Sequence, residues 1–387
     1  MTLADKGQVA RREMESQRTS RLVGEVVYIY AFDIAYELMR LPVGELLGQP
    51  LAQFVVDTSK RAPKQLVYYR PQMVRLPPLE RLGPRGRVRL ERSVKLLPVG
   101  AISIQVRVPF DVERVDELVP FHDLRFSDGG YLYDEVRRLA DEVRRELAPY
   151  CIRPVSQLGE EEAYTVFCLN NQLSALGLNA DRGAEDWVEL HRREIASLLT
   201  EEMDPEQLSS QEAEESTGRI VSYYKHDVAV MDWDAALLID DPKNFDESLY
   251  IMELANLQLA ELEAYDQILD DAVERAYRDL SVRGFRGLKT TIIQRELREI
   301  RVDFARITDE LSNISKFFGD WHLARLYQGL SARFHLGDWH TSIDGKLKTL
   351  DDLYQLLRQD QTNRWMLLME GTVVVLILFE IIKSFTG

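Results

Sequence analysis

The chain has 387 residues, of which 45% are hydrophobic and 29% are charged, and its formal net charge at neutral pH is −16. This composition is typical of packed cores and excludes disorder of the whole chain. The negative charge argues against a general affinity for nucleic acids. We also expect no specific binding to DNA. The two cysteines, Cys151 and Cys168, are too few and too far apart for a metal knuckle, so we expect packed thiols.

Residues 1–21 read as a polar N-terminal arm without the apolar core of a signal peptide. Residues 22–242 are expected to fold as an α+β domain, because runs of β-branched and aromatic residues mix with helical patterns without strict alternation. The predicted strands are 25–32, 66–69, 88–96, 101–108, 163–169, 220–224, 228–231 and 235–239, and the predicted helices are 133–147 and 187–202.

The positive charge is concentrated in one part of this domain. Residues 60–107 contain twelve basic residues against only Glu80 and Glu91, and seven prolines in residues 41–87 predict an irregular surface excursion there. Three interpretations stay open: a surface that balances the chain's own acidic helices, a site for anionic lipid or an acidic protein, and an RNA site. The candidate contact residues are Arg85, Arg87, Arg89, Arg92 and Lys95.

An acidic cluster surrounds a predicted hairpin near the end of the domain. Its members are His226, Asp227, Asp232, Asp234, Asp240 and Asp241. Carboxylates of this kind can bind a hard cation, which makes His226, Asp227, Asp232 and Asp234 weak metal candidates. The cluster lacks the glycine-punctuated loop of a calcium site, and aspartate is common in turns. We therefore expect a structural role, no cofactor and no catalytic residues, since no catalytic motif is present either.

After Asp241 and Pro242 the pattern becomes helical, and residues 243–364 are expected to form an antiparallel four-helix bundle of the coiled-coil type. Apolar residues recur with spacings of three and four along three seams. The seams are Met252 to Leu280, Ile293 to Phe318, and Ile343, Leu347, Leu350, Tyr354 and Leu357. No proline or turn signal follows the third seam, so we expect one continuous helix from about residue 342 to 384.

Residues 365–385 are the most apolar stretch and are expected to form one C-terminal transmembrane helix, because about 30 Å of helix matches a bilayer core. Basic residues that precede it favour a tail anchor with the bulk of the protein in the cytoplasm. Within the span, Glu370 and Glu380 are costly charges. We expect Glu370, Gly371 and Glu380 to form helix contacts between copies of a homo-oligomer.

The sequences ELANLQLAELEAYD, from Glu253, and LLMEGTVVVLILFEII, from Leu367, resemble the YagE or Rmd-type family of membrane-anchored proteins of unknown function. The resemblance is best from Ile220 onward. It implies a membrane anchor and, in organelle members, an association with ribosomes and translation. It implies no catalytic residues.

The sequence thus predicts a single-span, membrane-anchored scaffold or tether that is oligomeric and not an enzyme. One alternative is a membrane-bound, metal-dependent enzyme that uses the acidic cluster from His226 to Asp241. The other is a membrane tether for ribosomes or RNA that binds through the basic stretch of residues 60–107.

Overall fold

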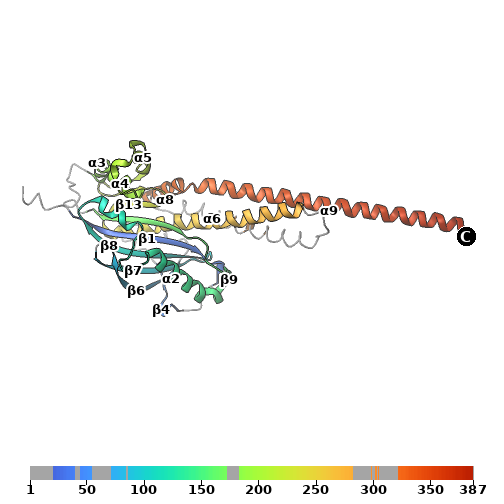
Figure 1. Ribbon diagram of the computed structural model, residues 1–387, viewed down its shortest axis with the longest axis horizontal. Coiled ribbons are helices and arrows are strands. Elements are labelled where there is room, and N and C mark those ends of the chain that lie inside the picture. Colours follow the sequence, from blue (N-terminus) through green and yellow to red (C-terminus); the bar gives the residue numbers. More distant parts are fainter. Residues whose placement is uncertain are drawn as a thin grey trace, which may run out of the picture. The chain divides into compact units, whose positions relative to one another are not determined.

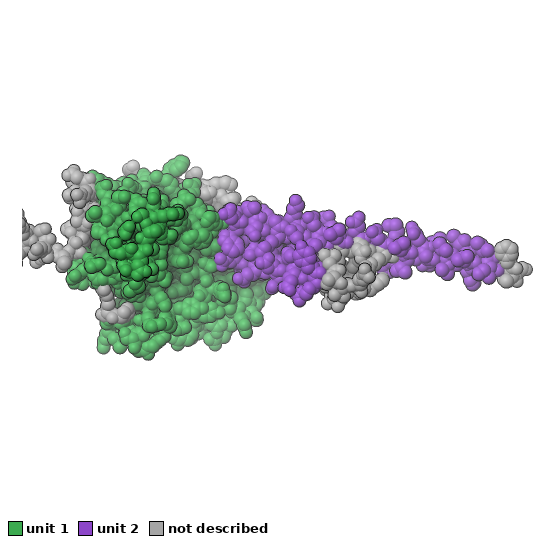
Figure 2. All heavy atoms as spheres, turned by 45° about the horizontal axis from the view of Figure 1, so that its top comes forward, with its two compact units in different colours: residues 1–261, 313–336 green, residues 262–312, 337–387 purple. Residues whose placement is uncertain are grey.

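The computed structural model describes residues 21–39, 44–54, 71–83, 86–171, 183–281, 298, 301–302, 304 and 321–386. The chain divides into two compact units (Figure 2). Unit 1 comprises Met1–Glu261 and Asn313–Leu336, and unit 2 comprises Leu262–Ser312 and Gly337–Gly387. The division falls inside a long helix.

Unit 1 is built on a mixed sheet of nine described strands in the spatial order β11-β12-β13-β10-β1-β8-β7-β6-β5 (Figure 1). Paired neighbours are antiparallel, apart from β10 and β13, which run parallel. The strands are β1 (Leu22–Asp33), β5 (Ala52–Gln53), β6 (Gln72–Gly83), β7 (Gly86–Leu96), β8 (Ala101–Val112), β10 (Glu162–Asn170), β11 (Ile220–Val221), β12 (Val228–Met231) and β13 (Ala235–Asp240). Two small ladders pair β2 (Ala35–Leu38) with β9 (Cys151–Pro154) and β3 (Glu45–Leu46) with β4 (Gln49–Pro50).

The helices of unit 1 connect and cover this sheet. They are η1 (Val115–Phe121), α2 (Leu132–Leu147), η2 (Ala148–Tyr150), α3 (Ala184–Leu190), α4 (Arg192–Leu199), η3 (Pro205–Gln207), α5 (Ser210–Ser216), η4 (Pro242–Asn244), the first part of α6 (Phe245–Ser281) and α8 (Trp321–Arg333). In α2, Val136, Leu139 and Val143 follow helical spacing and join the main core cluster. This helix therefore covers one face of the sheet with its apolar stripe.

The opposite face of the sheet is covered by α6 and carries both polar and apolar buried side chains, the latter including Val27 and Ile29 of β1. Along β8, Ile102 and Ile104 belong to the main core, whereas the alternate residue Ser103 is buried against Glu253 of α6. Leu257 of α6 packs on Ala101 and neighbouring apolar residues of the same face. The central strands are thus buried on both faces, and the face under α6 includes buried polar side chains among its apolar ones.

A glycine is required where β1 passes between its neighbours. A Cβ atom on Gly24 would lie 1.9 Å from the carbonyl oxygen of Cys168 on β10 and 2.8 Å from the ring of Phe110 on β8. Such an overlap cannot be relieved by rotating a flexible side chain, because one of the atoms belongs to the backbone. The close approach lets the Phe110 ring fill the space above β1.

Unit 2 contains the second part of α6 and nearly all of α9 (Leu336–Thr386). Leu262 and Leu269 of α6 are buried, as are Ile343 and Leu350 of α9. The ammonium group of Lys346 lies 2.6 Å from a carboxylate oxygen of Asp266 and 2.6 Å from one of Asp270, which places these helices side by side. Most of the predicted seam from Ile293 to Phe318 lies outside the described residues.

The proline-bearing segment 41–87 contains more regular structure than its composition predicts. Its second half includes the twelve-residue strand β6. Pro77 and Pro78 fit into this strand because the pairing with β7 shifts register between Leu76 and Leu79. The next strand outward, β5, pairs only with the beginning of β6. The prolines therefore lie at a bulge on a strand that is nearly an edge, where a missing N–H group is tolerated.

The membrane span predicted for residues 365–385 is wrong: among the described residues, no helix is long and apolar enough to cross a bilayer. The helix α9 is continuous through this stretch, but only residues 371–379 lie between Glu370 and Glu380. This charge-free run rises about 14 Å, less than half of a hydrocarbon core of about 30 Å. The predictions of a transmembrane fold element, a tail anchor and a single-pass membrane location depended on that span and are corrected with it.

A buried carboxylate makes the stability of unit 1 depend on pH. Burial raises the pKa of Asp33, at the end of β1, from 3.8 to about 6, and a hydrogen bond from the backbone of Ala35 opposes the shift. The unfolded chain loses this proton near pH 4, whereas the folded chain keeps it until near pH 6. Folding stability therefore decreases as the pH rises through this window.

We predict that Asp33→Asn removes this decrease. Between about pH 4 and about pH 7.5, the variant should gain about 2.5 kcal/mol of unfolding free energy relative to the wild type, since one pKa unit corresponds to about 1.4 kcal/mol and part of the decrease already occurs below pH 4. Urea unfolding of both proteins at the two pH values measures the gain. A difference that does not change with pH would contradict the raised pKa of Asp33.

Candidate functional site

The described part of the basic stretch lies on β6, β7 and β8, toward one edge of the large sheet. The described cationic residues of this stretch are Arg75 and Arg81 on β6, Arg87, Arg89, Arg92 and Lys95 on β7, and Arg107 on β8. Arg85 and the basic residues before Arg75 lie outside the described residues. The hairpin of β6 and β7 and the antiparallel pairing of β7 with β8 bring the described cations onto three neighbouring strands.

A pocket of about 380 Å³ opens where these strands meet the first turns of α6. Five cationic residues line it (Arg75, Arg89, Arg92, Lys95 and Arg107), against two acidic residues (Glu91 and Asp246). Its apolar wall consists of Phe54, Met73, Leu76, Pro78 and Leu249. The volume lies within the range of small-molecule sites, about 300–1,000 Å³.

Lys95 is the most deeply buried charged residue of this lining. Its side chain is only 5% exposed, and its ammonium group donates a hydrogen bond to the carboxylate of Glu253, which is 4% exposed. The same ammonium group lies 4.0 Å from the ring centroid of Phe54. Ser103 donates a hydrogen bond of 2.5 Å to the other oxygen of Glu253. The buried charges are therefore paired and fixed, as burial in a region of low polarity demands.

Arg107 is held in a second set of contacts at the pocket. Its guanidinium lies 3.2 Å from the carboxylate of Glu25 and also forms an ion pair with Asp246 on the first turn of α6. Burial raises the pKa of Glu25, and the charge of Arg107 opposes that shift. The two ion pairs of Arg107 connect β8 to β1 and to the start of α6 on this face of the sheet.

The structure brings only some of the predicted contact residues together. Arg89, Arg92 and Lys95 line the pocket, whereas Arg87 lies on the same strand outside it. Phe54, Asp246 and Glu253 belong to this part of the structure but were not predicted as contact residues. Glu253 had a sequence signal, because it is a carboxylate on an otherwise apolar helix, but its partner Lys95 is 158 positions away.

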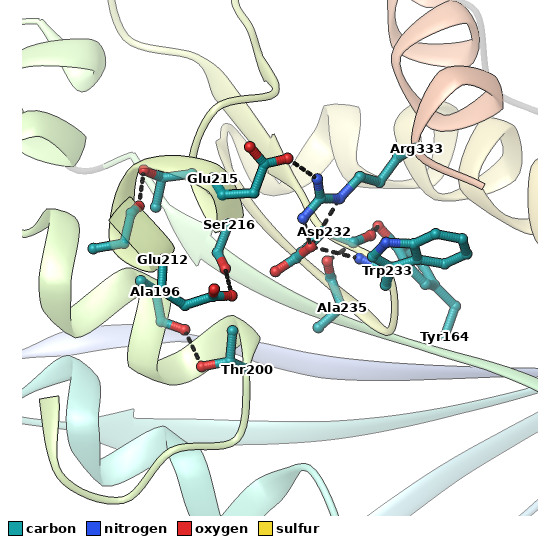
Figure 3. A network of polar contacts seen from close by, with 12 residues as sticks. Tyr164, Ala196, Thr200, Glu212, Glu215, Ser216, Asp232, Trp233, Ala235 and Arg333 are labelled. Atoms are coloured by element: carbon teal, nitrogen blue, oxygen red, sulfur yellow. Dashed lines mark hydrogen bonds and ion pairs between the residues drawn. The ribbon is translucent and has the colours of Figure 1, made fainter. Parts of the chain in front are cut away.

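The acidic cluster is used for hydrogen bonds within the fold. Asp232, with a side chain 6% exposed, forms an ion pair with Arg333 at the end of α8, and Nε of Arg333 lies 2.8 Å from the carboxylate (Figure 3). Arg333 also reaches Glu215 on α5 at 3.0 Å. The hydroxyl of Tyr164 donates to the backbone carbonyls of Asp232 and Ala235, at 3.2 and 3.1 Å. These contacts hold the turn between β12 and β13.

The other members of the cluster do not converge on one point. Asp227 accepts hydrogen bonds from the backbone N–H groups of Tyr223 and Tyr224, at 2.6 and 3.0 Å. Burial raises the pKa of Asp234, and the charge of Glu201 adds to the shift. The backbone carbonyl of His226 accepts a hydrogen bond from Asn171. Within the described part of the chain, no group of three such side chains could hold a metal ion.

The predicted helix contacts lie in the last part of α9. Glu370 and Gly371 are exposed, and nothing is described of the side chain of Glu380. Around them, fourteen large apolar side chains between Trp365 and Ile382 are 47–69% exposed. At the beginning of α9 the apolar seam is buried instead, with Ile343 and Leu350 at 0% exposure.

We predict that Arg333→Ala destabilises the protein by about 3 kcal/mol, because removing one partner of a buried ion pair leaves the other charge unpaired. Arg193→Ala is the matched control: Arg193 lies 3.4 Å from Glu206, and both side chains are exposed. The control should cost less than about 1 kcal/mol. Urea unfolding measures both losses, and equal losses would contradict the role assigned to Arg333.

Comparison with known proteins finds a match in the sheet-containing part of the chain. A family model described as the N-terminal domain of the uncharacterised protein MJ0711 matches residues 23–246. The uncharacterised protein MJ0711 of Methanocaldococcus jannaschii is 26% identical over 223 residues, which are 58% of this chain and 66% of that protein. The matched region thus spans slightly less than two thirds of the relative's length. No solved structure matches the chain.

The resemblance to the YagE or Rmd-type family is wrong. It rested on the residues from Ile220 onward and on the apolar tail, whereas the match found covers residues 23–246 and ends near the start of α6. A terminal helix with a glutamate on either side of an aliphatic run is a weak signal, because few residue types can form such a run. Since the family model covers more than half of the chain, the protein belongs to the family of the MJ0711 N-terminal domain.

Proposed function

We propose that the protein is a homo-oligomeric scaffold without catalytic activity, in which the last part of α9 joins copies of the chain. The observation that carries the proposal is the exposure of fourteen large apolar side chains between Trp365 and Ile382. A helix that is apolar on all sides is stable only when other structure surrounds it. The described residues leave this stretch uncovered, and we assign its cover to further copies of the chain.

A second copy of the chain fits this stretch because the buried seam of α9 continues into it. Ile343, Leu347, Leu350 and Tyr354 are buried within unit 2. The same alternation of three and four residues leads through Leu357, Gln361 and Arg364 to Leu368, Gly371, Val375, Leu378 and Ile382. A seam with this spacing is typical of helices that wind around each other. One continuous helix would then use one register for its own core and for assembly.

Glu370 and Gly371 occupy meaningful positions in such an assembly. Gly371 is exposed and has no atom within 4 Å of the place where a Cβ would stand. Since it lies on the seam, it allows neighbouring helices to approach closely. Glu370 and Glu380 flank the aliphatic run, and the seam extends past them to Leu368 and Ile382. These contacts are proposed between helices in water.

The size of the apolar surface favours more than two helices. Leu368, Val375 and Ile382 are 53%, 63% and 60% exposed, and covering a half-exposed aliphatic side chain contributes roughly 1 kcal/mol. Association itself costs about 4–15 kcal/mol. A pair of helices would cover only one side of each helix, so three or more give a clearer net gain.

The two alternative functions, a metal-dependent enzyme and an RNA tether, have weaker support than the exposed apolar stretch of α9 gives to assembly. The carboxylates proposed for a metal-dependent enzyme are used in the contacts of Asp227 and Asp232 described above. The RNA alternative rests on the basic stretch, where part of the positive charge is paired with Glu25 and Glu253. Scaffolding by self-association is therefore the function that the geometry supports best.

We predict that the full-length protein sediments in detergent-free buffer as a single oligomer, and that Val375→Glu combined with Leu378→Glu dissociates it. Two charges on the seam should raise the dissociation constant by at least about 100-fold, since burying an unpaired charge costs several kcal/mol. Analytical ultracentrifugation measures the change.

Leu356→Glu is the matched control, because Leu356 is 56% exposed on the same helix but outside the seam. It should leave the oligomer intact. A wild-type protein that sediments as a monomer, or an oligomer that survives the double substitution, would contradict the proposal.

A further inference from the structure

We infer that the pocket between β6, β7, β8 and the start of α6 binds a small phosphate-bearing ligand with a flat apolar body, of the nucleotide class. This site is separate from the proposed assembly through α9. The inference rests on the charge of the lining, on the arrangement of its cations and on its volume.

Charge is the first reason. The chain carries a formal net charge of −16, yet the pocket is lined by five cationic residues and two acidic ones. An anion in solution is repelled by most of the surface and attracted to this part of it. Glu253 and Glu25 neutralise Lys95 and Arg107 from behind the lining, so the attraction comes from the remaining arginines.

Arg75 and Arg89 are the arginines available to a ligand. Arg75 is exposed, and its guanidinium has neither a hydrogen bond nor an ion pair with any described residue. Arg89 lies 3.4 Å from Glu91, but both side chains are 59% exposed, so the pair is weak. Arginine suits phosphate because its planar group can donate two parallel hydrogen bonds to neighbouring oxygens.

The fixed contacts below these arginines keep the pocket open. Lys95 is held by Glu253, and Arg107 is held by Glu25 and Asp246. Because these side chains have partners, they do not need to move into the pocket to satisfy their charge. The floor of the site is therefore rigid, which lowers the entropic cost of binding.

The volume and the apolar wall indicate more than a bare phosphate ion. About 380 Å³ is far more than one phosphate group fills, and Phe54, Met73 and Pro78 present apolar surface on the lining. A ligand that combines an anionic group with a flat apolar body would use both kinds of surface. The pocket is too small for an oligonucleotide, so extended RNA is the less favoured occupant.

Titration calorimetry of the full-length protein with ADP, adenosine and inorganic phosphate tests the inference. ADP should bind more tightly than either adenosine or phosphate, and its affinity should fall with rising salt concentration. Hydrogen exchange of the wild type should show that ADP protects β6 and β7. Absence of ADP binding, or equal affinity for ADP and adenosine, would overturn the inference.

Substitutions locate the site. Arg75→Ala and Arg89→Ala should each weaken ADP binding by about tenfold, the effect of losing a charge-assisted hydrogen bond. Arg87→Ala is the matched control, because Arg87 lies on β7 outside the lining, and it should change the affinity by less than about threefold. All three residues are exposed, so the variants should fold.

Two further outcomes would overturn the inference. If Arg87→Ala weakens binding as much as Arg75→Ala, the attraction comes from diffuse surface charge and not from the pocket. If a single-stranded RNA binds and ADP does not, the strands form an extended nucleic-acid surface. Loss of the oligomer has no bearing on either result, so this test and the test of assembly fail independently.

Discussion

The burial of Lys95 is the constraint on which the packing of α6 against the sheet depends. An unpaired ammonium group at 5% exposure would cost several kcal/mol, so a carboxylate has to come from the structure that covers it. Glu253 on α6 supplies that carboxylate, and Ser103 satisfies its second oxygen. Charge pairing thus positions α6 on the strands, while apolar contacts such as Leu257 on Ala101 fill the space around the pair. The pocket lies where this cover begins, at Asp246 and Leu249.

Near the other edge of the sheet, a second buried ion pair also fixes a helix on the strands. Arg333 is 101 positions from Asp232, and their contact joins α8 to the turn between β12 and β13 (Figure 3). Tyr164 fixes the same turn from β10 through two backbone carbonyls. Asp232, which the sequence offers as a metal ligand, is therefore bound to Arg333 and stabilises a turn and a helix. A cluster of carboxylates along a chain indicates a metal only when their oxygens point to one place.

Local pattern predicted much of unit 1, because strand composition is a local property. The strand predicted at 25–32 lies within β1, and the one predicted at 88–96 lies within β7. The proline segment was harder to predict, since the bulge that accommodates Pro77 depends on its pairing with β7. The pocket could be predicted only in part: the basic residues are adjacent in sequence, but Glu253 and Asp246 reach them through the fold. Hydropathy also misled at the tail, where apolar composition alone does not distinguish a membrane span from a helix that needs other helices.

The two proposed activities occupy different parts of the chain, and the family match separates them. Residues 23–246 contain the β6–β8 surface and almost the whole pocket lining, with only Leu249 beyond the match. The apolar stretch from Trp365 onward lies outside it. The proposed ligand site therefore lies in the domain that the family shares, whereas the proposed assembly depends on residues outside the match, so the two can be changed by substitution independently.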